Sequence, residues 1–338
     1  MTAKTRYFLI GSALVLVLGL GIGVVAYYGG VSGGLFAQGP GPKELKYVPE
    51  DAAVVAYADV RQVMTSELRQ HLRQLDGVTD EGRSEFRDQT GIDIEHDIDY
   101  VVASMRGAEI SDHADGLVIA RGRFDQGRLE ALAVEHGGKV TEYRGKRMVM
   151  APVDRHRERA AAEAPEFALA FVEPGLMAMG SLPAVQQALE TGAAGRNVTD
   201  NAEMMKFVAE MQSESMWAVG RFDAVRAEAR LPAEVENRIP PITWFAASGR
   251  VNGGVQATVK VDARDEQAAD SLRDIVRGFV ALAKMQAGDK TEAAALLPAI
   301  ELGGTGKTVS VSFAVSTALL DAVSKGGAMK REAAPKKE

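Results

Sequence analysis

Residues 120–131 read ARGRFDQGRLEA, and residues 218–229 read AVGRFDAVRAEA. Eight of these twelve positions match at a constant offset of 98 residues. In both places an apolar stretch typical of a strand precedes the match, and a stretch with helical spacing follows it. Asp125 and Asp223 are expected to cap the two helices, because aspartate accepts hydrogen bonds from the first helical amides. The match predicts a duplicated α+β unit.

The rest of the body predicts more strands and helices of the same kinds. Glycine-containing turns separate short apolar runs, which is typical of antiparallel hairpins. The expected turns lie at residues 144–145, 174–175 and 252–253, the longest helix covers 265–287, and a strand covers 308–315. We therefore expect an α+β fold of mostly antiparallel sheets with helices packed on them, divided into a first unit over 47–199 and a second over 200–324.

An uncharged stretch precedes this body. Residues 7–28 read YFLIGSALVLVLGLGIGVVAYY, and 22 residues of helix span about 33 Å, which is enough to cross a bilayer core. The length favours an uncleaved transmembrane anchor over a cleaved signal peptide, whose apolar core is shorter. Lys4 and Arg6 place residues 1–6 in the cytoplasm and the body outside. The alternative of a cleaved segment stays open.

Gly19 and Gly23 form a small-xxx-small pair within this stretch. Such pairs let two membrane helices approach closely, so this pair is a candidate for self-association. The plainer interpretation is that glycine is common in membrane helices.

Composition excludes several chemistries. The chain has no cysteine and a net charge of −7, so disulfides, thiolate catalysis and cysteine-bound metals are excluded, and an acidic body argues against nucleic-acid binding. Residues 29–46 are rich in glycine and proline and predict a flexible linker. Residues 325–338 carry five basic and two acidic residues and predict a disordered basic tail.

An acidic run invites comparison with a calcium loop. Such a loop needs glycine at its sixth position and glutamate at its twelfth. Counted from Asp93, these positions hold Ile98 and Ser104. We therefore expect the acids of this run to lie in a connection at the start of a strand. The run comprises Asp93, Glu95, Asp97 and Asp99.

Other candidate motifs also do not match the sequence patterns of known functional sites. Residues 303–308 read GGTGKT, but the phosphate-loop pattern needs glycine where Glu301 stands and a helix where a strand is expected. None of the five histidines forms a close metal-ligand pair. Trp217 and Trp244 lie on expected strands and are assigned to the core. The sequence thus predicts no catalytic, cofactor-binding or metal-binding residue.

Several segments resemble a known group of proteins. They read VPEDAAVVAYADV from residue 48, TGIDIEHDIDYVV from 90, LVIARGRFD from 117, GLMAMGSLPAVQQAL from 175 and WAVGRFD from 217. They are similar to uncharacterised exported or membrane-anchored bacterial proteins built from duplicated strand–helix units. The resemblance implies a bacterial envelope location and an α+β fold, and it supplies no catalytic residue.

Two functions follow as hypotheses. The first is a non-enzymatic binding or accessory module of an envelope complex, held in the bacterial inner membrane by a single span, with the bulk of the chain periplasmic. It would bind a protein partner or a second copy, and it needs no cofactor. The alternative is an envelope hydrolase or ligand sensor whose site is assembled from scattered acids and histidines. A deep pocket would favour the second hypothesis, and an exposed apolar patch the first.

Overall fold

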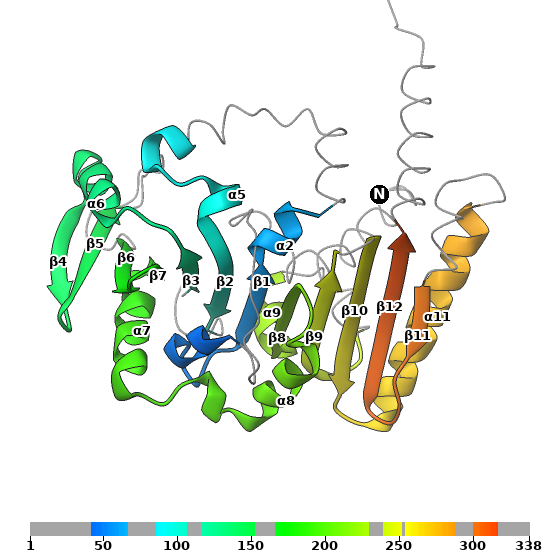
Figure 1. Ribbon diagram of the computed structural model, residues 1–338. Helices are drawn as coiled ribbons and strands as arrows, with labels where there is room; N and C mark the ends of the chain where they lie inside the picture. The colour runs from blue at the N-terminus through cyan, green and yellow to red at the C-terminus, as the bar shows by residue number, and fades with distance from the viewer. Residues whose placement is uncertain are drawn as a thin grey trace, which may run out of the picture. The chain divides into compact units, whose positions relative to one another are not determined.

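The computed structural model describes residues 42–66, 86–106, 116–152, 166–229, 239–251, 254–287 and 300–316 (Figure 1). The expected anchor with Gly19 and Gly23, and the basic tail, lie outside these ranges. Within them, no helix combines the length and the apolar character that a bilayer crossing requires. The chain forms two compact units, Met1–Met64 with Thr79–Glu228, and Thr65–Val78 with Ala229–Glu338. The boundary therefore falls at 228/229, whereas the sequence placed it at 199/200.

The first unit is built on eight described strands in the order β8-β1-β2-β3-β7-β6-β5-β4. Every neighbouring pair is antiparallel, as expected for an α+β fold. The turns at 144–145 and 174–175 are confirmed, because Arg144, Gly145 and Gly175 have φ values of 52°, 72° and 70°. The strands are β1 Val54–Asp59, β2 Ile98–Met105, β3 Gly116–Gly122, β4 Lys139–Tyr143, β5 Lys146–Pro152, β6 Glu166–Glu173, β7 Leu176–Ser181 and β8 Met216–Arg221.

Helices cover both faces of these strands. Helix α7 contacts β3, β6, β7 and the short 3-10 helix η1 on one face. On the other face, apolar residues around α5 and α6 form two clusters with the strands. The helices are η1 Lys43–Tyr47, α2 Val60–Met64, α5 Ile94–Asp97, α6 Gln126–Glu135, α7 Leu182–Ala194, η2 Val198–Asp200, α8 Ala202–Met211 and α9 Phe222–Ala229.

The last four residues of the predicted linker over 29–46 belong to a short helix. Residues 43–46 belong to η1, in which Glu44 and Leu45 are buried. The glycine-rich composition gives no sign of this, because Glu44 is held by Arg121, an arginine from a strand 77 residues away. The linker prediction is therefore wrong for residues 43–46.

The second unit contains four described strands in the order β11-β12-β10-β9, again all antiparallel. Helix α11, Glu266–Ala287, contacts β10, β11 and β12 and confirms the longest predicted helix. Its first turns carry Ala268 and Ala269, which pack with Val309 in one apolar cluster. The strands are β9 Ile242–Arg250, β10 Gly254–Ala263, β11 Ile300–Gly303 and β12 Thr308–Ser316.

The matching twelve-residue segments differ where strand meets helix. Asp125 caps α6 as predicted, because its side chain accepts a hydrogen bond from the Arg128 amide at 3.0 Å. Asp223 does not cap a helix: α9 begins at Phe222, directly after β8, and Asp223 lies inside its first turn. The cap prediction for Asp223 is wrong, since its carboxylate bonds the next amide, that of Ala224. These segments do not show the duplication.

Alanine replacement should destabilise the protein more at Asp125 than at Asp223. Asp125→Ala is expected to lower the free energy of unfolding by about 0.5–2 kcal/mol, the usual loss for a helix cap. Asp223→Ala should stay within about 0.5 kcal/mol of the parent, because an exposed residue without a cap is replaced. Urea denaturation of both variants measures the difference, and equal losses would contradict the assignment.

Candidate functional site

The predicted acidic run lies around α5, and its first member, Asp93, has partners close to it in sequence. Asp93 caps α5 by accepting from the Glu95 amide at 2.9 Å. It also lies 3.1 Å from Nδ1 of the exposed His96. The connection and strand start predicted here are confirmed, with the addition of one short helical turn.

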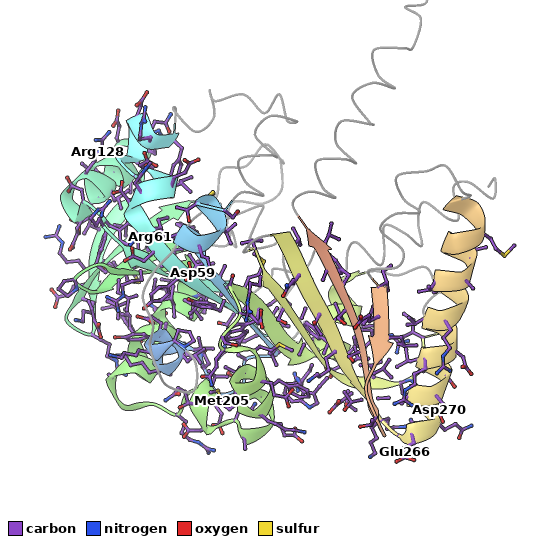
Figure 2. All side chains as sticks on the ribbon, turned by 45° about the vertical axis from the view of Figure 1, so that its right-hand side comes forward. Asp59, Arg61, Arg128, Met205, Glu266 and Asp270 are labelled. Atoms are coloured by element: carbon purple, nitrogen blue, oxygen red, sulfur yellow. The ribbon has the colours of Figure 1, made fainter. Side chains whose placement is uncertain are left out.

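The other two aspartates of this run pair with arginines. Asp97 accepts from Arg123 at 2.9 Å, and Asp99 forms an ion pair with Arg61. Arg61 follows the end of β1 that carries Asp59 (Figure 2). In the described part of the chain, no three histidines, aspartates or glutamates gather as metal ligands would.

The glycine-rich motif at 303–308 is a turn between two strands, as predicted. Strand β11 ends at Gly303 and β12 begins at Thr308. Gly304 and Gly306 adopt positive φ values of 92° and 56°. Arg273 of α11 donates to the carbonyl oxygens of Gly306 and Thr308 at 2.7 and 2.9 Å. These contacts fix the turn to the helix.

The assignment of Trp217 to the core is confirmed. Its side chain is buried on β8, and its ring stacks on that of Tyr57 with centroids 5.8 Å apart. Trp244 on β9 is half-buried. His96 and His136 are exposed. The other three histidines, His71, His113 and His156, lie outside the described residues.

A partly buried polar network at η1 is a feature that the sequence did not reveal. We call it the η1 cluster, and it comprises Glu44, Tyr47, Tyr100, Arg121 and Glu173. Glu44 accepts from Nη2 and Nε of Arg121 at 2.7 and 3.2 Å. Tyr47 donates to Glu173 at 2.5 Å. The cluster joins η1 to β2, β3 and the end of β6, and no local pattern marks residues so distant in sequence.

Two members of the η1 cluster, Glu173 and Tyr100, have shifted pKa values. The hydrogen bond from Tyr47, followed by that from Lys46, lowers the pKa of Glu173 to about 2. Burial, assisted by the Glu44 charge, raises the pKa of Tyr100 to about 12. Both shifts move away from neutrality, whereas a general acid or base needs a pKa near the working pH. These groups are therefore suited to holding structure and unsuited to transferring protons at pH 7.

The lowered pKa of Glu173 makes the stability of the protein depend on pH. Its folded-state pKa of about 2 lies below the ordinary 4.5. Its contribution to stability is therefore present above pH 4.5 and fades as the pH falls toward 2. Glu173→Gln should lower the melting temperature at pH 7 and have a smaller effect at pH 3. Thermal unfolding at both pH values tests this, and an equal effect at both would contradict it.

The described residues form a shallow hollow beside the start of α7. It has room for about one water molecule. Such a hollow is far smaller than a small-molecule site, which usually measures about 300–1,000 Å³. Its lining comprises Pro49, Ala52, Ser104, Arg106, Leu117, Ala184 and Gln187.

Helix α11 carries the most promising interaction surface. Glu266 and Asp270 mark its N-terminal end, which packs on the strands (Figure 2). Farther along, Ile275 and Phe279 are each 38% exposed, and Leu282 is half-buried. Residues spaced by four and three positions lie on one side of a helix. These three form what we call the α11 ridge.

Comparisons with known proteins add little to this picture. No protein-family model matches the chain. No curated protein matches it in sequence. Crystal form I of TP0453 is similar in structure, with a TM-score of 0.44 and 9% sequence identity over 84% of this chain and 97% of that chain. A score of this size carries no inference about what this chain does.

Proposed function

We propose that this protein is a non-enzymatic binding module of an envelope complex, anchored in the bacterial inner membrane by residues 7–28 with its body outside. The α11 ridge is the observation that carries the proposal. It presents large apolar side chains to solvent on a helix whose first turns are packed on a sheet. Exposed apolar surface of this kind is typical of interaction sites.

The spacing of the ridge indicates the kind of partner. Ile275, Phe279 and Leu282 occupy positions i, i+4 and i+7 of the helix. An amphipathic helix with this spacing lays its apolar side into a groove of another protein. A protein partner with an apolar groove therefore fits the ridge.

The charge of the N-terminal residues supports the orientation. Lys4 and Arg6 precede an uncharged stretch, and no charge follows it until Lys43. Positive residues remain on the cytoplasmic side of a membrane helix. The body, with α11, would then face partners outside the cytoplasm.

Two variants with the same change in net charge test the ridge. Ile275→Asp/Phe279→Asp places two negative charges on it, whereas Arg277→Asp makes an equal charge change on the opposite side of α11. Arg277 is exposed and pairs with Asp274 of the same helix. The control should therefore leave the ridge intact.

Affinity capture of the full-length protein from membranes measures the outcome. We expect a specific protein to co-purify with the parent and with Arg277→Asp, and its recovery to fall at least about 10-fold with the ridge variant, since each charge would be buried without a partner. Absence of a specific partner, or equal recovery with both variants, would overturn the proposal.

A further inference from the structure

Strand β12 ends beside the C-terminal half of α11. The helix and β12 both run opposite to β10, so they point the same way (Figure 1). Ala269 of the helix and Val309 of the strand share one apolar cluster. From Val309 to Ser316 the strand advances about 23 Å, a length that corresponds to about 15 residues of helix. Ser316 therefore lies level with the end of the α11 ridge.

The residues that follow Ser316 match the α11 ridge in apolar character and in length. Residues 317–324 read TALLDAVS, and they lie outside the described residues. Leu319 and Val323 are four positions apart, and Leu320 adjoins them, so an apolar side is expected if the segment is helical. Eight residues of helix measure about 12 Å, close to the length of about 10 Å between Ile275 and Leu282.

We infer that residues 317–324 dock on the α11 ridge of their own chain and compete there with the protein partner. The inference rests on the proposed function, because the ridge is the surface that both would bind. No linker separates the segment from β12, so its effective concentration at the ridge is on the order of millimolar or higher. A partner must displace the segment, which makes the segment autoinhibitory.

The absence of cysteine makes disulfide trapping a direct test. Ile275→Cys/Val323→Cys places one thiol on the ridge and one on the apolar side of the segment. Arg277→Cys/Val323→Cys is the matched control, with its first thiol on the opposite side of α11. In purified, oxidised full-length protein, the first pair should form an intramolecular disulfide at least about 10-fold faster than the control.

Equal rates would overturn the inference, and a disulfide between two chains would assign the ridge to a second copy. These outcomes need no partner protein. Failure of docking is therefore distinguishable from failure of the proposed function, which appears only in capture from membranes.

Truncation supplies an independent measurement. A chain ending at Ser316 lacks the segment and the basic tail, whereas a chain ending at Ser324 lacks only the tail. Removing the segment should raise the fluorescence of a dye that binds apolar surface and increase partner recovery several-fold. The chain ending at Ser324 should behave like the parent. Equal dye fluorescence from both truncated chains would contradict docking.

Discussion

Arg121→Met is expected to lower the free energy of unfolding by about 3–5 kcal/mol, the usual loss when one member of a buried ion pair is removed. The variant leaves the Glu44 carboxylate, only 2% exposed, without the guanidinium that donates to it through Nε and Nη2. Urea denaturation followed by circular dichroism measures the loss.

Two further variants test whether the unpaired Glu44 carboxylate causes the loss of stability. Arg123→Met removes an exposed arginine that pairs with Asp97, and such pairs contribute about 0–1 kcal/mol. Glu44→Met/Arg121→Met removes both charges, including the buried carboxylate, and should recover much of the stability lost in Arg121→Met. If Arg121→Met were no less stable than Arg123→Met, the buried pair would not hold η1 in place.

Gly122→Ala should lower the free energy of unfolding by about 2–3 kcal/mol, toward the upper end of the range for an overpacked interior. A Cβ atom at position 122 would collide with the Asp97 carbonyl oxygen and lie 2.8 Å from the Ile98 Cα. Both atoms belong to the backbone, so no side-chain rotation relieves the clash. Relief requires β2 and β3 to separate.

Gly116→Ala is the matched control, because Gly116 stands at the other end of β3 and a Cβ there would meet nothing within 4 Å. It should be neutral or slightly stabilising, since alanine reduces the freedom of the unfolded chain. Thermal unfolding measures the melting temperatures of the two variants. Equal melting temperatures would show that the strands accommodate a methyl group at both ends.

Much of the local structure could be predicted from the sequence because its causes lie within a few residues. Ser181 stands directly before α7, and its hydroxyl accepts a hydrogen bond from the Ala184 amide. Gly91 has a positive φ of 74°, in a region of backbone conformation that favours glycine. The hairpin turn at 144–145 is a further case, since glycine reaches positive φ without steric cost. The antiparallel α+β class followed from many such short signals.

The tertiary structure alone decided which distant residues meet. Glu44 was assigned to a linker by the glycines before it, yet strand order places it against Arg121 and buries it. Asp223 shares its GRFD setting with Asp125, yet the shorter join between β8 and α9 removes its capping role. The sequence predicted where α11 lies along the chain, whereas its packing on the sheet decided that Ile275 and Phe279 stay exposed. Caps and turns depend on backbone geometry over three or four residues, whereas ion pairs and exposed ridges depend on which surfaces the strand order brings together.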